Sequence, residues 1–233
     1  MTGRSAHRKV AASLLAVCVA MLACATGSAA QTPPSPAQVM AYEALHRAAH
    51  DGNAGEIRRL AAQGSNINAR DSDGRTPAHV AAFAVKPAAL KALAEAGADM
   101  NAREGRAYDI VTIAAVANEP DLMSLAIELG NRADLITSPY NGTALIAAAH
   151  LGHAEVVRRL IAAGAPLDHV NNLGWTALIE AVILGNGGPD HVATVRALVE
   201  AGANTAIADR NGVTPLAHAR ARGFDEMARI IAR

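Results

Sequence analysis

The chain of 233 residues is poor in the residue types that usually carry chemistry. Its two cysteines, Cys18 and Cys24, both lie near the N-terminus, so the rest of the chain offers no disulfide, catalytic thiol or cysteine metal ligand. Basic and acidic residues balance at 21 each, which leaves no basic field for nucleic acid or an anionic membrane. Aromatic residues make up only 3% of the sequence.

The motifs of common enzyme classes are absent as well. There is no Gly-x-Ser-x-Gly, no Walker loop, no His-Glu-x-x-His and no Cys-x-x-Cys. Residues 185–188 are rich in glycine but lack the strand and the lysine of a phosphate cradle. His46 and His50 have the i, i+4 spacing of a metal chelate, with a structural role as the alternative. We therefore expect a non-enzymatic protein with no cofactor and no metal.

The first 30 residues have the pattern of a secretory signal peptide. Arg4, Arg8 and Lys9 precede an apolar run from Val10 to about Ala25, and small residues follow up to Ala30. The run is short for a membrane span, which needs about 20 apolar residues. We expect cleavage after Ala30, although residues 21–24 loosely resemble a lipobox that would place a lipid on Cys24.

Without residues 1–30 the chain has 18 basic and 21 acidic residues, a net charge of about −3. Residues 31–38 are rich in proline and are predicted to form a disordered linker. Abundant alanine and a preference for arginine over lysine are typical of a high-GC bacterium. We therefore expect a periplasmic protein, with a lipoprotein or a secreted protein as the alternatives.

Five glycines recur at a nearly fixed period along the remaining sequence. Gly64, Gly97, Gly130, Gly164 and Gly202 are about 33, 33, 34 and 38 residues apart. Each follows an amphipathic segment with apolar residues at i, i+3 and i+4, and glycine is the usual left-handed terminator of such a helix. A period of about 33 residues indicates a repeat protein.

A second motif keeps the same register and predicts the start of another helix in each repeat. It reads Gly-Arg-Thr-Pro-Ala-His at 74–79, Gly-Thr-Ala-Leu at 142–145, Gly-Trp-Thr-Ala-Leu at 174–178 and Gly-Val-Thr-Pro-Leu at 212–216. The threonine hydroxyl can cap the helix, and proline suits its first position. Each repeat is thus predicted to be a turn, a helix, a short loop and a second helix.

These motifs resemble the ankyrin-repeat family over roughly residues 40–233. The resemblance implies an all-α solenoid of about six stacked repeats without a central core, and His46 and His79 would be structural histidines that hydrogen-bond across a hairpin. We place the ankyrin domain at 39–233, with N- and C-terminal caps and with repeats at about 39–70, 71–103, 104–137, 138–170, 171–208 and 209–233.

Two repeats depart from the pattern. In the third, Asp109 replaces the capping threonine, although its carboxylate can still cap the helix. The fifth carries about five extra residues near 185–190, which are either a neutral loop insertion or a binding loop.

The resemblance also implies recognition of a protein partner through the hairpin tips and the exposed positions of each first helix. Aromatic residues and arginines anchor many interfaces, and this sequence places several of them at the tips. The alternative is that each ring packs over a neighbouring hairpin. The predicted binding residues are Arg75, Arg106, Tyr108, Tyr140 and Trp175 from the tips, with Phe83, His150 and Ile183 from the helices.

Three roles are compatible with this surface. We expect a monomeric periplasmic adaptor or scaffold that binds or protects another protein. The alternatives are an inhibitor or immunity protein acting on a toxin or exported enzyme, and a surface-tethered lipoprotein or secreted effector. No nucleic-acid partner and no membrane span are expected.

Overall fold

The computed structural model describes residues 31–233, and its compact repeat unit comprises residues Pro33–Arg233. The predicted signal peptide and Cys24 lie outside the described residues. Within them the chain consists of helices and loops, without strands. A short helix α2 (Pro36–Ala41) precedes six helix pairs: α3 (Ala44–Asp51) with α4 (Ala54–Ala62), α5 (Pro77–Phe83) with α6 (Pro87–Glu95), α7 (Ile110–Val116) with α8 (Pro120–Glu128), α9 (Ala144–Leu151) with α10 (Ala154–Ala162), α11 (Ala177–Ile183) with α12 (Pro189–Glu200), and α13 (Pro215–Ala221) with α14 (Asp225–Ile231).

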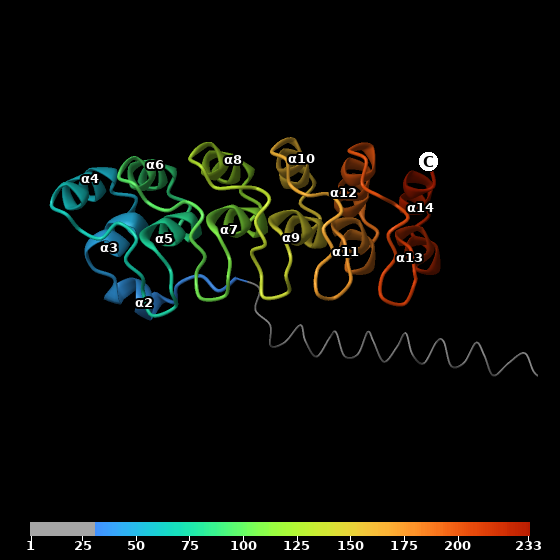
Figure 1. The fold of residues 1–233 in the computed structure, drawn as a ribbon, viewed down its shortest axis with the longest axis horizontal. Coiled ribbons are helices and arrows are strands. Elements are labelled where there is room, and N and C mark those ends of the chain that lie inside the picture. Colours follow the sequence, from blue (N-terminus) through green and yellow to red (C-terminus); the bar gives the residue numbers. More distant parts are fainter. Residues whose placement is uncertain (1–30) are drawn as a thin grey trace, which may run out of the picture. The chain divides into compact units, whose positions relative to one another are not determined.

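The helix pairs of residues 33–233 stack in register and form two layers (Figure 1). The first helices of the pairs, from α3 to α13, pack against one another, and so do the second helices, from α4 to α14. Each pair contacts its sequence neighbours, as expected for a solenoid whose stability is a sum of interfaces between repeats. The predicted all-α stack of six repeats is confirmed.

The predicted start and stop signals act as expected. Thr143, Thr176 and Thr214 each accept a hydrogen bond from the backbone N–H three residues on, at the start of α9, α11 and α13. Asp109 caps α7 in the same way. The five periodic glycines that follow the second helices all have positive φ, between 82° and 103°, a conformation that glycine adopts without steric cost.

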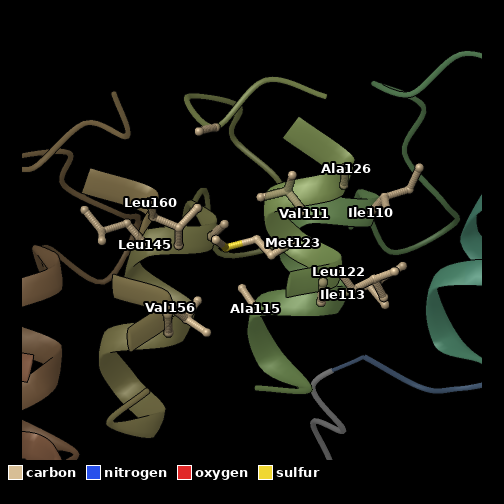
Figure 2. Packing of buried hydrophobic residues seen from close by; sticks show 14 of the residues in the cluster. Ile110, Val111, Ile113, Ala115, Leu122, Met123, Ala126, Leu145, Val156 and Leu160 are labelled. Atoms are coloured by element: carbon tan, nitrogen blue, oxygen red, sulfur yellow. The ribbon is translucent and has the colours of Figure 1, made fainter. Parts of the chain in front are cut away.

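The core is a continuous row of small and aliphatic side chains between the two layers. In the middle of the stack, Met123 extends from α8 toward Leu145 and Leu160, which belong to the next pair (Figure 2). These three side chains have no solvent exposure. The small Ala115 and Ala126 on α7 and α8 are equally buried and let the helices approach closely.

Repeat 3 replaces the usual capping motif with a buried polar network. The Asp109 carboxylate accepts hydrogen bonds from the Thr112 hydroxyl at 2.6 Å and from the Asn131 side-chain amide at 2.8 Å. Thr112 Oγ1 lies 2.6 Å from Thr137 Oγ1 in the following loop. These bonds link the first helix to the loop that follows the second helix, as His79 does in repeat 2, where its Nε2 lies 3.1 Å from the Ala102 carbonyl.

The prediction of a disordered linker is wrong for residues 36–38, because they belong to α2. A capping box between Ser35 and Gln38 starts this helix, and Pro36 occupies its first turn. Gln38 and Tyr42 then hydrogen-bond to Asp73 and Asp71 of the first hairpin loop. The segment thus packs against the first hairpin loop, at the N-terminal end of the described stack.

The extra residues of repeat 5 are part of the packed structure. The helix α12 has 12 residues whereas the other second helices have 9 or 7, so part of the insertion forms an additional helical turn. The loop before α12 is covered by the last repeat: Arg222 donates a hydrogen bond to the Gly185 carbonyl at 2.9 Å, and a Cβ on Gly187 would come within 2.6 Å of the Phe224 ring.

Candidate protein-binding surface

Five hairpin loops connect the repeats, and we number them in chain order: loop 1 (63–76), loop 2 (96–109), loop 3 (129–143), loop 4 (163–176) and loop 5 (201–214). Each turn is closed in the same way, by one polar side chain that accepts two backbone N–H groups. In loop 4, Asn171 Oδ1 accepts from Leu173 and Trp175, both at 3.0 Å. The equivalent acceptors are Asp71, Glu104, Ser138 and Asp209. A polar residue at this position thus fixes the shape of every turn.

Neighbouring loops are tied together by hydrogen bonds. The Gly105 N–H donates to the Asp73 carbonyl at 2.8 Å, and the Asn172 N–H donates to the Tyr140 carbonyl at 2.9 Å. Loops 3 and 4 have a further link from His169 Nε2 to the Asn141 carbonyl at 2.6 Å. The loops therefore form an ordered edge along the stack, and side chains on adjacent tips have defined relative positions.

Three of the predicted binding residues are buried, which corrects the prediction that they are exposed anchors. Arg75, Tyr108 and Trp175 are 3%, 7% and 8% exposed. All three occupy the same repeat position, directly before the N-cap residue of the first helix, and their carbonyls accept a hydrogen bond from across the turn. This position lies at the base of the hairpin and not at its tip, so the side chain packs inside the stack.

Arg75 makes contacts that explain its burial. Its guanidinium lies 3.2 Å from the Asp71 carboxylate and 3.0 Å from that of Asp73. It also lies 5.9 Å from the centre of the Phe83 ring, which brings together two residues predicted for the site. Tyr42 donates a hydrogen bond to Asp71 at 2.7 Å, so this cluster joins α2 to repeat 2. Its role is to hold the N-terminal end of the stack together.

The remaining predicted residues do line the surface. Tyr140 is 40% exposed at the tip of loop 3, and Arg106 is exposed at the tip of loop 2. Phe83, His150 and Ile183 lie at equivalent positions near the end of the first helices, where Phe83 and Ile183 are partly buried and the His150 side chain is about half exposed. Binding by these residues remains a prediction.

Of the most distinctive feature of the surface, sequence analysis predicted only Tyr140 as a binding residue. Four large apolar side chains on loops 3 and 4 are exposed to solvent: Ile136 at 41%, Tyr140 at 40%, Val170 at 44% and Leu173 at 42%. We call these four residues the apolar surface. Ile136 and Val170 share one repeat position, which Arg70 and Arg103 occupy in loops 1 and 2. Comparison of the repeats position by position could therefore have found them.

A buried carboxylate is hydrogen-bonded to loop 4. Glu180 on α11 is 5% exposed, and its Oε1 accepts a hydrogen bond from Asn171 Nδ2 at 2.7 Å. Its Oε2 faces His150 Nδ1 of α9 at 3.6 Å. Burial raises the pKa of Glu180 to about 7, so the protonated and ionised forms coexist near neutral pH.

The histidines found at repeat positions have hydrogen-bonding roles. His46 Nε2 lies 3.1 Å from the Arg75 carbonyl, and His153 Nδ1 lies 2.9 Å from the Ala115 carbonyl. His79 is fully buried, and burial lowers its pKa to about 4, so it is neutral at physiological pH. Across residues 31–233, no three His, Cys, Asp or Glu side chains are gathered closely enough to hold a metal ion.

The stacked helix pairs and their ordered hairpin loops define the chain as a helical repeat protein. A model of ankyrin repeats in three copies matches residues 12–104 and 111–209. The chain belongs to the ankyrin-repeat family. Ankyrin repeats are generally protein–protein interaction modules. No helix between residues 31 and 233 is long and apolar enough to cross a membrane.

Several known proteins are similar to the chain. An ankyrin repeat domain from Acinetobacter baumannii is 42% identical, with a TM-score of 0.76 over 81% of this chain and 95% of that one. The ankyrin repeat domain of Bcl-3, a member of the IkappaB family, is 27% identical, with a TM-score of 0.74 over 82% and 86%. The ankyrin repeat protein YahD of Escherichia coli is 38% identical over 113 residues, which span 48% of this chain and 56% of YahD.

Proposed function

We propose that the chain binds a protein partner through the apolar surface of loops 3 and 4 and acts as an adaptor or protective partner in the bacterial periplasm. The observation that carries this proposal is the exposure of Ile136, Tyr140, Val170 and Leu173 on adjacent, hydrogen-bonded loops. Contiguous exposed apolar side chains cost solubility and commonly mark an interaction site. The hairpin tips do not need them for stacking, because loops 1 and 2 stack with arginine at the corresponding position.

The test combines crosslinking and affinity. A photoreactive residue in place of Leu173 is expected to crosslink one partner in cells, which is then purified for binding measurements. A variant with serine at all four positions of the apolar surface is expected to bind at least tenfold more weakly. The control is Met40→Ser with Val85→Asn, which changes two exposed apolar residues, 76% and 40% exposed, outside loops 3 and 4. Equal affinity of the serine variant and the wild type would contradict the proposal.

The proposed location rests on the residues of the N-terminal segment, from the basic Arg4 to the small residues before Gln31. Fractionation of cells is expected to place the protein in the periplasm, with a mass and N-terminal sequence that begin at Gln31. A lipid-modified N-terminus at Cys24 would assign it to the lipoproteins instead, and an intact N-terminus in the cytoplasm would contradict export.

A further inference from the structure

Glu180 is a charged residue at a position that is apolar in the three preceding helix pairs. Counted from the start of the first helix, its equivalents there are Val80 in α5, Ile113 in α7 and Ala147 in α9, whereas the two end pairs have Arg47 in α3 and His218 in α13. Val80 and Ile113 are buried in the core. A buried carboxylate costs free energy unless it is well paired, so glutamate here does not serve the apolar packing that Val80 and Ile113 provide.

The carboxylate of Glu180 is incompletely paired. One oxygen accepts the hydrogen bond from Asn171, but Oε2 receives none from the chain between residues 31 and 233. Its neighbour His150 Nδ1 lies at 3.6 Å, beyond hydrogen-bond distance. Burial and the nearby His191 lower the pKa of His150, which disfavours its cationic form. The second oxygen therefore has room for a stronger cationic donor.

The same carboxylate is hydrogen-bonded to loop 4, which carries two residues of the apolar surface. Asn171, its hydrogen-bond donor, lies in loop 4 between Val170 and Leu173. On the other side His150 has a side chain that is 49% exposed, while that of Glu180 is 7% exposed. The partly exposed Ala147 at the adjacent position of α9 is too small to cover the carboxylate. A partner seated on loops 3 and 4 would thus lie against the loop whose Asn171 holds Glu180.

We propose that Glu180 binds the basic side chain, arginine or lysine, of a protein segment whose apolar side chains cover the apolar surface. This inference rests on the proposed function, since it specifies the chemistry of the same partner. A guanidinium or ammonium group supplies charged N–H donors to Oε2, and charge-assisted hydrogen bonds of this type are about twice as strong as neutral ones. The apolar side chains of the partner segment bury the apolar surface on binding, and the buried carboxylate of Glu180 selects for the basic residue.

The experiment uses the full chain and a synthetic peptide array. Each peptide has a central residue that is arginine, lysine, glutamine, leucine or glutamate, flanked by varied apolar residues. For the wild type we expect peptides with central arginine or lysine to bind at least tenfold more tightly than their glutamine counterparts. Glu180→Gln keeps the shape of the side chain and is expected to reduce this ratio to about one. Glu128→Gln, which removes an exposed charge on α8, is expected to leave the ratio unchanged.

The outcomes separate the two proposals. A general loss of folding lowers affinity for all peptides together, whereas loss of a specific contact changes only the preference for the basic residue. Binding without preference in the wild type, or an unchanged preference in Glu180→Gln, contradicts the role of Glu180 and leaves the apolar surface in place. If no peptide binds, both this inference and the proposed apolar binding surface are contradicted.

Discussion

Loops 1 and 2 differ from loops 3 and 4 in the residue at one repeat position, and stacking of the loops does not determine which residue this is. In the first pair, Arg70 donates to the Arg103 carbonyl at 2.7 Å, and Arg103 donates to the Ile136 carbonyl at 3.2 Å. In the second pair the position holds Ile136 and Val170, both more than 40% exposed. The loops are tied by backbone hydrogen bonds in both pairs. The residue at this position is therefore not required by the fold, and an apolar side chain there is evidence for function.

The two halves also differ in the buried groups that titrate. Burial lowers the pKa of His79 in repeat 2 to about 4 and raises that of Glu180 in repeat 5 to about 7. The ordinary pKa values are 6.5 for a histidine and 4.5 for a glutamate. As the pH falls below 6.5, the unfolded chain binds a proton that buried His79 resists, so stability falls. As the pH rises above 4.5, the unfolded chain loses a proton that Glu180 retains, and stability also falls.

The largest effect is expected at the base of the hairpins. Replacing Trp175 with alanine should destabilise the fold by about 3–5 kcal/mol, because it removes a large buried ring. Replacing the exposed Tyr140 on the neighbouring tip should change stability by at most about 0.5 kcal/mol. Urea unfolding of both variants measures the contrast. A stable Trp175→Ala protein with reduced partner binding would return Trp175 to the interface and contradict its structural role.

Most of the fold could be predicted from the sequence because each local signal has one physical cause. The glycines end the second helices, Thr143, Thr176 and Thr214 start first helices, and Asp109 substitutes for threonine with the same geometry. The helical segment at Pro36–Ala41 was missed because its prolines also fit a disordered linker. What stabilises it is a long-range contact with Asp71 and Asp73, which no local pattern reveals.

The candidate site was predicted only in part. Residue type alone identified Tyr108 and Trp175 as anchors, but burial depends on the distance from the turn, and these residues lie two positions past the tip. Exposed Ile136 and Val170 gave no signal as single residues, because aliphatic residues are also the core residues of this fold. Glu180 was missed because its neighbour Asn171 comes from the loop and not from the same helix.

Glu180 is expected to lower the stability of the fold as the pH rises from 4.5 to 8. Glu180→Gln should raise the free energy of unfolding by about 3 kcal/mol at pH 8, because glutamine has no buried charge to form. The gain should shrink as the pH falls toward 4.5, where the carboxyl is protonated in both states. Thermal unfolding from pH 5 to 8 gives the test. A difference from the wild type that does not depend on pH would mean that Glu180 titrates normally.

His79 is expected to lower the stability of the fold as the pH falls from 7 to 5. Glutamine in place of His79 can keep the capping-box bond to the Thr76 N–H, which His79 Nδ1 accepts at 3.1 Å, without titrating. We expect wild-type stability to fall by about 2 kcal/mol between pH 7 and pH 5 through this residue, and His79→Gln to remove that loss. Urea unfolding at the two pH values measures it. A parallel loss in both proteins would assign the acid sensitivity to other groups.

The smallest effect on stability is expected from making loops 3 and 4 resemble loops 1 and 2. Arginine in place of Ile136 and Val170 can donate to the carbonyl of the next loop, as Arg70 and Arg103 do. Folding free energy should therefore stay within about 0.5 kcal/mol of the wild type. Partner affinity should nevertheless fall at least tenfold, since two of the four apolar side chains are gone and a cationic pair faces the incoming basic segment. Calorimetric binding to the purified partner provides the measurement. If binding and stability are both unchanged, the apolar residues of loops 3 and 4 carry no function, and the contrast between the loops reflects neutral variation at a permissive position.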